Sequence, residues 1–151
     1  MKKSPFGFDK PEDSPGFLLW QTTIIWQRQI KISLDPYDLS HAQFVILATT
    51  CWHQHQNLKV TQGLIVNLSK LDKMTVSKSL KKLENKGYAK RIECKEDTRA
   101  KLVILTKKGM DLVTQLIPVV EKIDADFFGI LNKAHQKMLI SHLSSLASSA
   151  V

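Results

Sequence analysis

The chain has 151 residues, of which 43% are hydrophobic and 24% charged, and it carries a formal net charge of +8. This length and composition fit one compact unit with a substantial apolar core. They exclude a membrane-spanning helix, because no apolar run approaches the roughly 20 residues that a bilayer requires. The N-terminus is basic but has no apolar segment, so we expect no secretory signal, no membrane partner and a cytoplasmic location.

The first 34 residues divide into an arm and a helix. Residues 1–13 contain two prolines, a glycine and little periodicity, which predicts a flexible N-terminal arm. Ser14 followed by Pro15 is typical of a helix start, so a helix is expected over 14–34. This helix is apolar on more than one face, which indicates that it packs against more than its own domain.

Three further helices are predicted in the middle of the chain. Ser40 begins a capping-box pattern and starts the second helix. Thr61 starts a short third helix. Asp72 is the expected N-cap of a fourth helix over 72–86, and Gly87 ends it as a left-handed cap. The apolar residues that face the core from this helix recur at i, i+4 and i+7: Val76, Leu80 and Leu83.

Two β-type runs and two more helices complete the chain. The runs 88–94 and 101–105 are separated by a short polar segment, which is typical of a β-hairpin. Thr106 opens a long helix, in which Pro118 is expected to produce a kink. The last helix is amphipathic and carries the apolar residues Met138, Leu139, Leu143 and Leu146.

The whole net charge lies in residues 69–108, which hold 13 Lys or Arg against 5 Asp or Glu. The other residues hold 9 side chains of each sign, which cancel. A local excess of this size, on one helix and one hairpin, is the electrostatic footprint of a nucleic-acid-binding surface.

The order of three helices and a two-stranded hairpin predicts a winged helix-turn-helix, so the fold class is mainly α with a small β-hairpin wing. In such proteins the second helix of the motif enters the major groove of double-stranded DNA, with its N-terminal residues at the base edges. Lysines further along this helix are placed for phosphates. Arg99, at the hairpin tip, would reach an adjacent minor groove. The other candidate DNA-binding residues are Lys73, Met74, Thr75, Ser77, Lys78, Lys81, Lys82 and Lys101.

The hairpin and the start of the next helix carry a specific motif. Residues 97–109 read DTRAKLVILTKKG and match the pattern D-x-R-A-x-x-x-x-L-T-x-x-G. Upstream, residues 83–88 read LENKGY. Both segments resemble the MarR family of transcriptional regulators, in its wing and at the end of its recognition helix. The resemblance covers roughly residues 14–148.

This resemblance implies a homodimer that binds a pseudo-palindromic duplex. The helices over 14–34 and 107–151 would intertwine with those of the partner chain, and residues 35–106 would form the DNA-binding domain. By family analogy Arg99 is the wing arginine, and Asp97 is a further candidate DNA-binding residue because it orients the wing loop.

The family resemblance also implies a small aromatic effector as a partner. MarR-like proteins often bind aromatic or phenolic compounds between the dimer helices and the winged domain. The candidate ligand-binding residues are Trp20, His41, Phe44 and Trp52. The alternative is that the tryptophans belong to the core or to the dimer interface.

The sequence contains none of the common catalytic motifs, so neither an enzyme nor a cofactor is expected. Cys51, His53 and His55 do not all share one helix face, and no metal site is predicted from them. Cys51 and Cys94 lack disulfide spacing and are expected to be free thiols. A redox-sensitive Cys94, close to Arg91, is the alternative.

The sequence therefore predicts a dimeric, sequence-specific transcriptional regulator, with repression as the expected mode. The alternative is a protein-interaction module on a winged-helix scaffold, whose basic face would meet an acidic partner. Such an interface would favour aromatic anchors. No aromatic residue lies in 69–87, which favours DNA as the partner.

Overall fold

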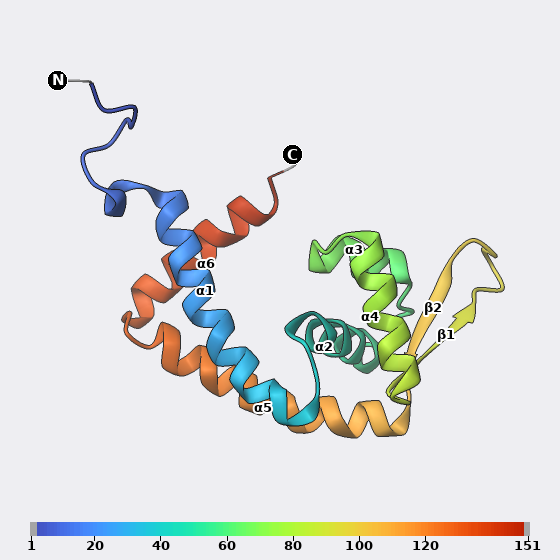
Figure 1. The fold of residues 1–151 in the computed structure, drawn as a ribbon. Helices are drawn as coiled ribbons and strands as arrows, with labels where there is room; N and C mark the ends of the chain where they lie inside the picture. Colours follow the sequence, from blue (N-terminus) through green and yellow to red (C-terminus); the bar gives the residue numbers. More distant parts are fainter. Residues whose placement is uncertain (1–2, 150–151) are drawn as a thin grey trace.

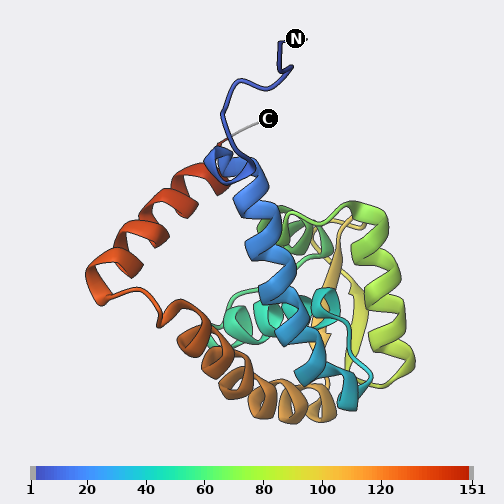
Figure 2. The same ribbon diagram turned by 60° about the vertical axis from the view of Figure 1, so that its left-hand side comes forward.

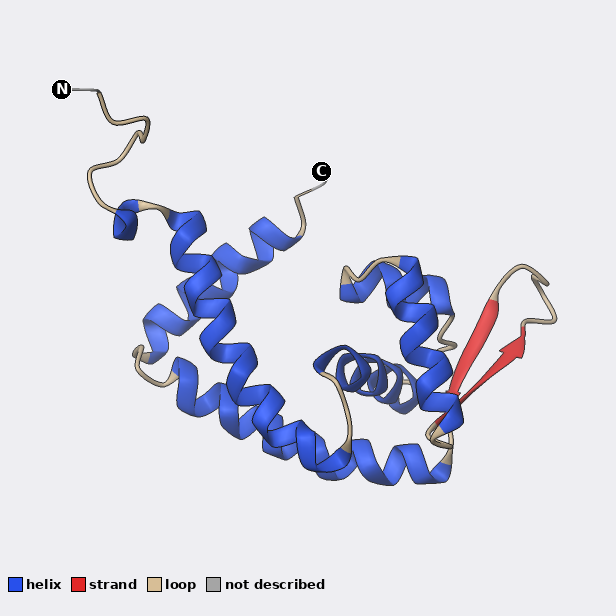
Figure 3. Ribbon diagram, in the orientation of Figure 1, coloured by secondary structure: helices blue, strands red, loops and turns tan. Residues whose placement is uncertain are grey.

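The computed structural model describes residues 3–149, and it forms six α-helices and one β-hairpin over that range (Figure 1). Two short 3-10 helices flank the first helix. The elements are η1 Pro11–Asp13, α1 Pro15–Leu34, η2 Asp35–Tyr37, α2 His41–His55, α3 Gln62–Ser69, α4 Lys73–Asn85, β1 Ala89–Glu93, β2 Lys101–Leu105, α5 Lys107–Phe128 and α6 Lys133–Ala147. The predicted fold class, mainly α with a two-stranded wing, is confirmed (Figure 3).

Side-chain caps set the helix starts that the sequence predicts. The Ser14 side chain accepts a hydrogen bond from the backbone N–H of Phe17, at the start of α1. Ser40 and Gln43 form the complete capping box of α2. Each cap satisfies a backbone N–H that has no partner within its own helix. The remaining predicted caps, Thr61, Asp72 and Thr106, also accept a hydrogen bond from the third helical residue.

Helix α2 lies at the centre of the winged domain and packs against α3, α4, α5 and β2 (Figure 1). The hydrophobic core joins side chains from these elements, all without exposed surface: Ile46, Leu47, Ile65, Val76, Leu80, Leu83, Val113 and Leu116. The three residues predicted to face the core from α4 are therefore confirmed. Because α4 is held by this apolar stripe, its opposite face remains in solvent.

The wing is an antiparallel hairpin in which Arg91 pairs with Val103. On its other edge, β2 is joined to the segment before α3, because the N–H of Val103 donates to the carbonyl of Val60 at 2.8 Å. The Thr61–Leu102 bridge extends this pairing. The wing is thus attached to the helix-turn-helix by backbone hydrogen bonds as well as by its own turn.

One threonine connects the end of α4 to the start of α5. Thr106 caps α5 by accepting from the N–H of Gly109 at 3.0 Å, and its hydroxyl donates to the carbonyl of Gly87 at 2.5 Å. Gly87 has a φ of 78°, which confirms the predicted left-handed cap. Gly109 packs so closely on the Tyr88 backbone that an added Cβ would lie 1.9 Å from the Tyr88 carbonyl oxygen.

The structure adds a short helix to the predicted arm and shows the long helix as one continuous element. Within the arm, residues 3–10 form no helix or strand, but Pro11–Asp13 form η1 rather than irregular chain. Residues 1–2 of the arm, and 150–151 at the predicted C-terminal end, lie outside the described residues. Helix α5 continues through Pro118 as one element of 22 residues.

Helix α6 and the N-terminal part of α1 extend away from the winged domain (Figures 1 and 2), while the C-terminal end of α1 packs against α2 and α5 and buries Ile30 and Leu34. Within the described chain, α6 buries none of its residues. Large apolar side chains on the two helices are exposed: Phe17, Leu18, Leu19, Trp20, Ile24, Ile25 and Ile32 on α1, and Met138, Ile140, Leu143 and Leu146 on α6. In the part of the chain that the structure describes, no helix has the length and apolarity needed to span a membrane.

Candidate nucleic-acid interface

The N-terminal half of α4 presents polar and basic side chains to solvent. Asp72 holds this end in place, because its carboxylate accepts from both the backbone N–H and the hydroxyl of Thr75, each at 2.8 Å. These hydrogen bonds lower the pKa of Asp72 below its ordinary value. Met74 lies on the same helix and is 66% exposed. The lysines exposed on the same helix are Lys73, Lys78, Lys81 and Lys82.

The wing loop is ordered by short-range hydrogen bonds that leave Arg99 exposed at its tip. The Asp97 carboxylate accepts from the N–H of Arg99 at 3.0 Å, and the Asp97 carbonyl accepts from the N–H of Ala100 at 3.0 Å. This geometry agrees with the predicted role of Asp97 in orienting the loop. Lys59 and Glu96 form an ion pair of 2.7 Å that ties the loop to the segment before α3 and lowers the pKa of Glu96.

A groove of about 560 Å³ separates α4 from the wing. Its lining brings together five residues predicted from the sequence as DNA-binding: Lys73, Ser77, Asp97, Arg99 and Lys101. The N-terminal part of α3 forms the third wall with Gln62, Gly63 and Val66. The groove therefore places the N-terminal half of α4 and Arg99 on one face. Met74, Thr75, Lys78, Lys81 and Lys82 lie outside this lining, elsewhere on α4.

Arg91 is a groove residue that the sequence analysis did not assign. Its Nε donates to Glu84 at 2.6 Å, and its Nη1 lies 3.4 Å from the side-chain oxygens of Gln62 and Ser77. The Arg91 side chain is only 18% exposed. Arg91 therefore connects α3, α4 and β1, and the Glu84 carboxylate offsets its charge. The Ser77 hydroxyl accepts from Arg91, which leaves its own O–H free to act as a donor.

Comparisons with known proteins agree with this geometry. Residues 35–122 match the family model described as "ArnR1-like, winged-helix domain". The chain is 40% identical over 126 residues to a Bacillus subtilis protein named "Uncharacterized HTH-type transcriptional regulator YdcH", covering 83% of this chain and 86% of that relative. The chain belongs to the ArnR1-like winged-helix family and is an HTH-type transcriptional regulator.

Solved structures show the same fold for this regulator. A MarR-family transcriptional regulator from Rhodococcus sp. RHA1 superposes with a TM-score of 0.84 at 21% identity, covering 95% of this chain and 100% of that one. Bordetella bronchiseptica BpsR, described as regulated in its DNA binding by 6-hydroxynicotinic acid, gives a TM-score of 0.83 at 23% identity, with 97% and 100% covered. The chain therefore has the fold of these MarR-family structures.

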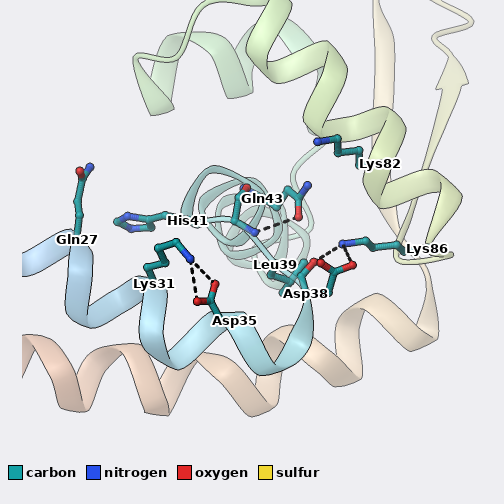
Figure 4. Close-up of a pocket in the computed structure, with 10 residues that line it drawn as sticks. Gln27, Lys31, Asp35, Asp38, Leu39, His41, Gln43, Lys82 and Lys86 are labelled. Atoms are coloured by element: carbon teal, nitrogen blue, oxygen red, sulfur yellow. Dashed lines mark hydrogen bonds and ion pairs between the residues drawn. The ribbon is translucent and has the colours of Figure 1, made fainter.

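The four candidate ligand-binding residues of the regulator do not lie in one cavity. His41 lines a pocket of about 650 Å³ between α1, α2 and α4, together with Lys31 and Lys82 (Figure 4). Phe44 and Trp52 line a separate pocket of about 550 Å³ between α2 and α5. Trp20 is 66% exposed on α1 and lines neither.

The His41 pocket lies between α1 and the C-terminal end of α4. Lys86, the C-cap of α4, pairs with Asp38, and Lys31 of α1 pairs with Asp35, on its rim (Figure 4). Burial lowers the pKa of His41, and the nearby Asp124 carboxylate offsets part of that shift. The lowered pKa favours the neutral imidazole, which can donate or accept a hydrogen bond.

The cysteines of the regulator are both buried and free. Cys94 Sγ lies 3.8 Å from a Glu96 carboxylate oxygen. Among residues 3–149, no group of three or more His, Cys, Asp or Glu side chains is placed to hold a metal ion. His53 is turned towards the carbonyl of Thr49, at 2.8 Å, while His55 contacts Cys51. The two histidines therefore diverge, as their spacing in the sequence indicates.

Proposed function

We propose that this regulator represses transcription as a homodimer bound to a pseudo-palindromic operator in cytoplasmic DNA. Residues 35–106 bind one half-site, with the N-terminal half of α4 in the major groove and Arg99 in the adjacent minor groove. The observation that carries the proposal is the shared groove, because it places Lys73, Ser77 and Arg99 on one face of the molecule. Repression is the mode expected of a protein that occupies an operator.

The exposed apolar faces of α1 and α6 support the homodimer. Soluble monomers rarely leave large contiguous apolar patches in solvent. Helix α6 has no buried residue in the described chain, and Ile140 is 67% exposed. A second copy of residues 14–34 and 107–149 offers a matching apolar surface, which a two-fold symmetric interface requires.

The charge distribution supports DNA rather than an acidic protein as the partner. The net charge of +8 lies within residues 69–108, and phosphate neutralisation by Lys and Arg makes affinity steeply salt-dependent. The exposed face of α4 carries hydroxyl and ammonium groups suited to base edges and phosphates. Asp97, Lys81, Lys82 and Lys101 complete the proposed DNA-binding set by orienting the wing or meeting phosphates.

A small aromatic acid is the proposed effector, bound in the His41 pocket. BpsR is described as regulated by 6-hydroxynicotinic acid. Lys82 in the lining of this pocket suits a carboxylate, whereas Lys31 and Lys86 are already paired with Asp35 and Asp38. The pocket touches α1 and α4, so a ligand there can favour one spacing of the two recognition helices. To release DNA, the effector must bind the dimer with this spacing of recognition helices more tightly than it binds the DNA-bound conformation. Trp20, Phe44 and Trp52 are the alternative candidates.

The effector proposal is tested with aromatic acids, 6-hydroxynicotinic acid among them, added to the complex of regulator and DNA. We expect one or more to release the duplex from the native chain and to lose this effect in His41→Ala. Release that is unchanged by the substitution would assign the effector to another cavity.

The DNA proposal is tested by selecting bound duplexes from a random pool at low and at moderate salt. Enrichment of a pseudo-palindrome, with half-sites about one helical turn apart, is the expected result. Binding without enrichment that vanishes as salt rises would contradict sequence recognition. The interaction module with an acidic partner would then become the better explanation of the basic face.

A further inference from the structure

Two sulfur donors and one imidazole donor lie together on the side of α2 that faces α5. Cys51 and His55 are one turn apart on α2, and Met110 lies near the start of α5. The Cys51 Sγ is 3.5 Å from the Met110 Sδ and 3.7 Å from the His55 Nδ1. None of the three lines the groove between α4 and the wing.

This cluster borders a cavity with a largely apolar wall. Cys51 and His55 line the pocket of about 550 Å³, together with Phe44, Trp52, Ile117 and Val120. Cys51 is only 5% exposed, and its burial raises the pKa of the thiol. His55 is exposed, so the cavity gives an ion a path from solvent to the sulfur atoms.

The two separations measured from the Cys51 sulfur are compatible with ligands of one ion. First-row metal ions bind thiolate sulfur at about 2.3 Å and imidazole nitrogen at about 2.0 Å. In a trigonal arrangement these lengths place sulfur and nitrogen roughly 3.7 Å apart, and two sulfurs roughly 4.0 Å apart. The Cys51–His55 separation matches the first value. The Met110 sulfur needs to move by about 0.5 Å, which its flexible side chain permits.

The chemistry of the donors selects Cu(I). Thiolate and thioether ligands prefer soft ions, and imidazole also binds copper well. Zinc sites are built from Cys, His and carboxylate ligands, usually four, and residues 3–149 contain no such group of even three. A methionine as the third ligand therefore distinguishes this cluster from a zinc site.

We propose that Cys51, His55 and Met110 form a binding site for one Cu(I) ion per chain. On binding, the thiol proton leaves to solvent and the thiolate sulfur bonds to the ion, with no change of oxidation state. The His55 Nδ1 lies 3.0 Å from the Cys51 carbonyl oxygen, so it carries the ring proton when no metal is bound. That proton moves to Nε2 when Nδ1 becomes a ligand.

The site lies close to the wing strand β2, although its existence does not depend on DNA binding. The Gln54 side chain, one residue before His55, accepts a hydrogen bond from the N–H of Leu105 at 2.9 Å. Helix α5 begins two residues after Leu105. Copper between α2 and α5 would therefore hold together the two helices that meet the base of the wing.

The test is an anaerobic titration of the full chain with Cu(I) supplied from a coloured copper chelator. The native chain is expected to remove one Cu(I) per chain, and X-ray absorption should show two sulfur ligands and one nitrogen. Cys51→Ser should abolish binding, while Met110→Leu and His55→Ala should each weaken it by about tenfold or more. Cys94→Ser is the matched control, because it removes the other buried thiol and should bind as the native chain does.

Either of two results would overturn the proposal. One is a native chain that takes no Cu(I) from the chelator or that prefers Zn(II). The other is Met110→Leu binding copper as tightly as the native chain. Met110→Leu conserves volume in the core, so it is expected to fold, and its circular dichroism spectrum confirms this before the titration.

Discussion

Close packing explains why a glycine stands at position 109, the last residue of the motif over residues 97–109. An alanine Cβ there would lie 1.9 Å from the Tyr88 carbonyl oxygen, which is backbone and cannot rotate away. We expect Gly109→Ala to lower the free energy of unfolding by about 3 kcal/mol, at the upper end for overpacked sites. Urea unfolding followed by circular dichroism measures this change.

Gly63 provides the matched control for that substitution. It also lies in the first turn of a helix, but an added Cβ would meet only the Thr61 Oγ1, at 3.9 Å. Gly63→Ala should therefore raise stability by about 0.5–1 kcal/mol through helix propensity. Equal effects of the two substitutions would contradict the close approach of α5 to Tyr88.

Arg99 carries the minor-groove part of the proposed interface. Its backbone is fixed by Asp97 while its side chain is exposed. Arg99→Ala should cost roughly 1–3 kcal/mol of binding to the selected duplex, measured by fluorescence anisotropy at fixed salt. Lys122→Ala removes one charge from α5, away from the groove, and should leave affinity nearly unchanged. If Arg99→Ala binds DNA at moderate salt as tightly as the native chain does, the wing is not part of the DNA interface.

Part of the site could be predicted from local sequence and part could not. The exposed lysines of α4 follow from the helical spacing of Val76, Leu80 and Leu83, because the core face determines the opposite face. Arg91 was missed, since a strand residue gives no local sign that it will reach Glu84 and Gln62. Its role depends on how three separate elements pack.

At the scale of elements, α4 depends on its N-cap. The Asp72 pKa lies below the ordinary value of about 3.9 because hydrogen bonds from Thr75 stabilise the carboxylate. Its contribution to stability is therefore complete above that ordinary value and is lost as the pH falls through the lower, folded-state pKa. The start of the recognition helix should weaken in acid.

The test compares the native chain with Asp72→Asn, which can still cap the helix but cannot titrate there. The urea midpoint of unfolding is measured for both chains between pH 6 and about pH 2. Below about pH 4, the midpoint of Asp72→Asn should fall less steeply with decreasing pH than that of the native chain. Glu96→Gln serves as a second comparison, since Lys59 lowers the Glu96 pKa as well. Parallel curves for the native chain and Asp72→Asn would show that the cap makes no titratable contribution.

Element boundaries were largely predictable because their signals are local. The caps at Ser14, Ser40 and Thr106 each act within three residues along the chain. Contacts over long separations were not predictable in this way. Met110 meets Cys51 across 59 positions, and Trp26 donates to Asp124 at 2.8 Å across 98 positions. Such pairs depend on the angles at which α1, α2 and α5 cross.

At the scale of the whole molecule, the terminal helices require a partner for their apolar faces. Ile140 is 67% exposed at the middle of α6, and a lysine there would place a charge in the proposed dimer interface. Ile140→Lys should shift the sedimenting species towards the mass of one chain and weaken DNA binding. Lys137→Ala, at an exposed position on the same helix, should remain a dimer. A monomeric native chain would contradict the proposed assembly.

The most direct measurement is a hydroxyl-radical footprint of the regulator on its selected duplex. Protection should be symmetric about the centre of the pseudo-palindrome, with two half-sites about one helical turn apart and a protected minor groove beside each. The minor-groove protections alone should disappear in Arg99→Ala. One protected half-site, or a footprint without symmetry, would contradict a dimer that reads DNA with α4 and the wing.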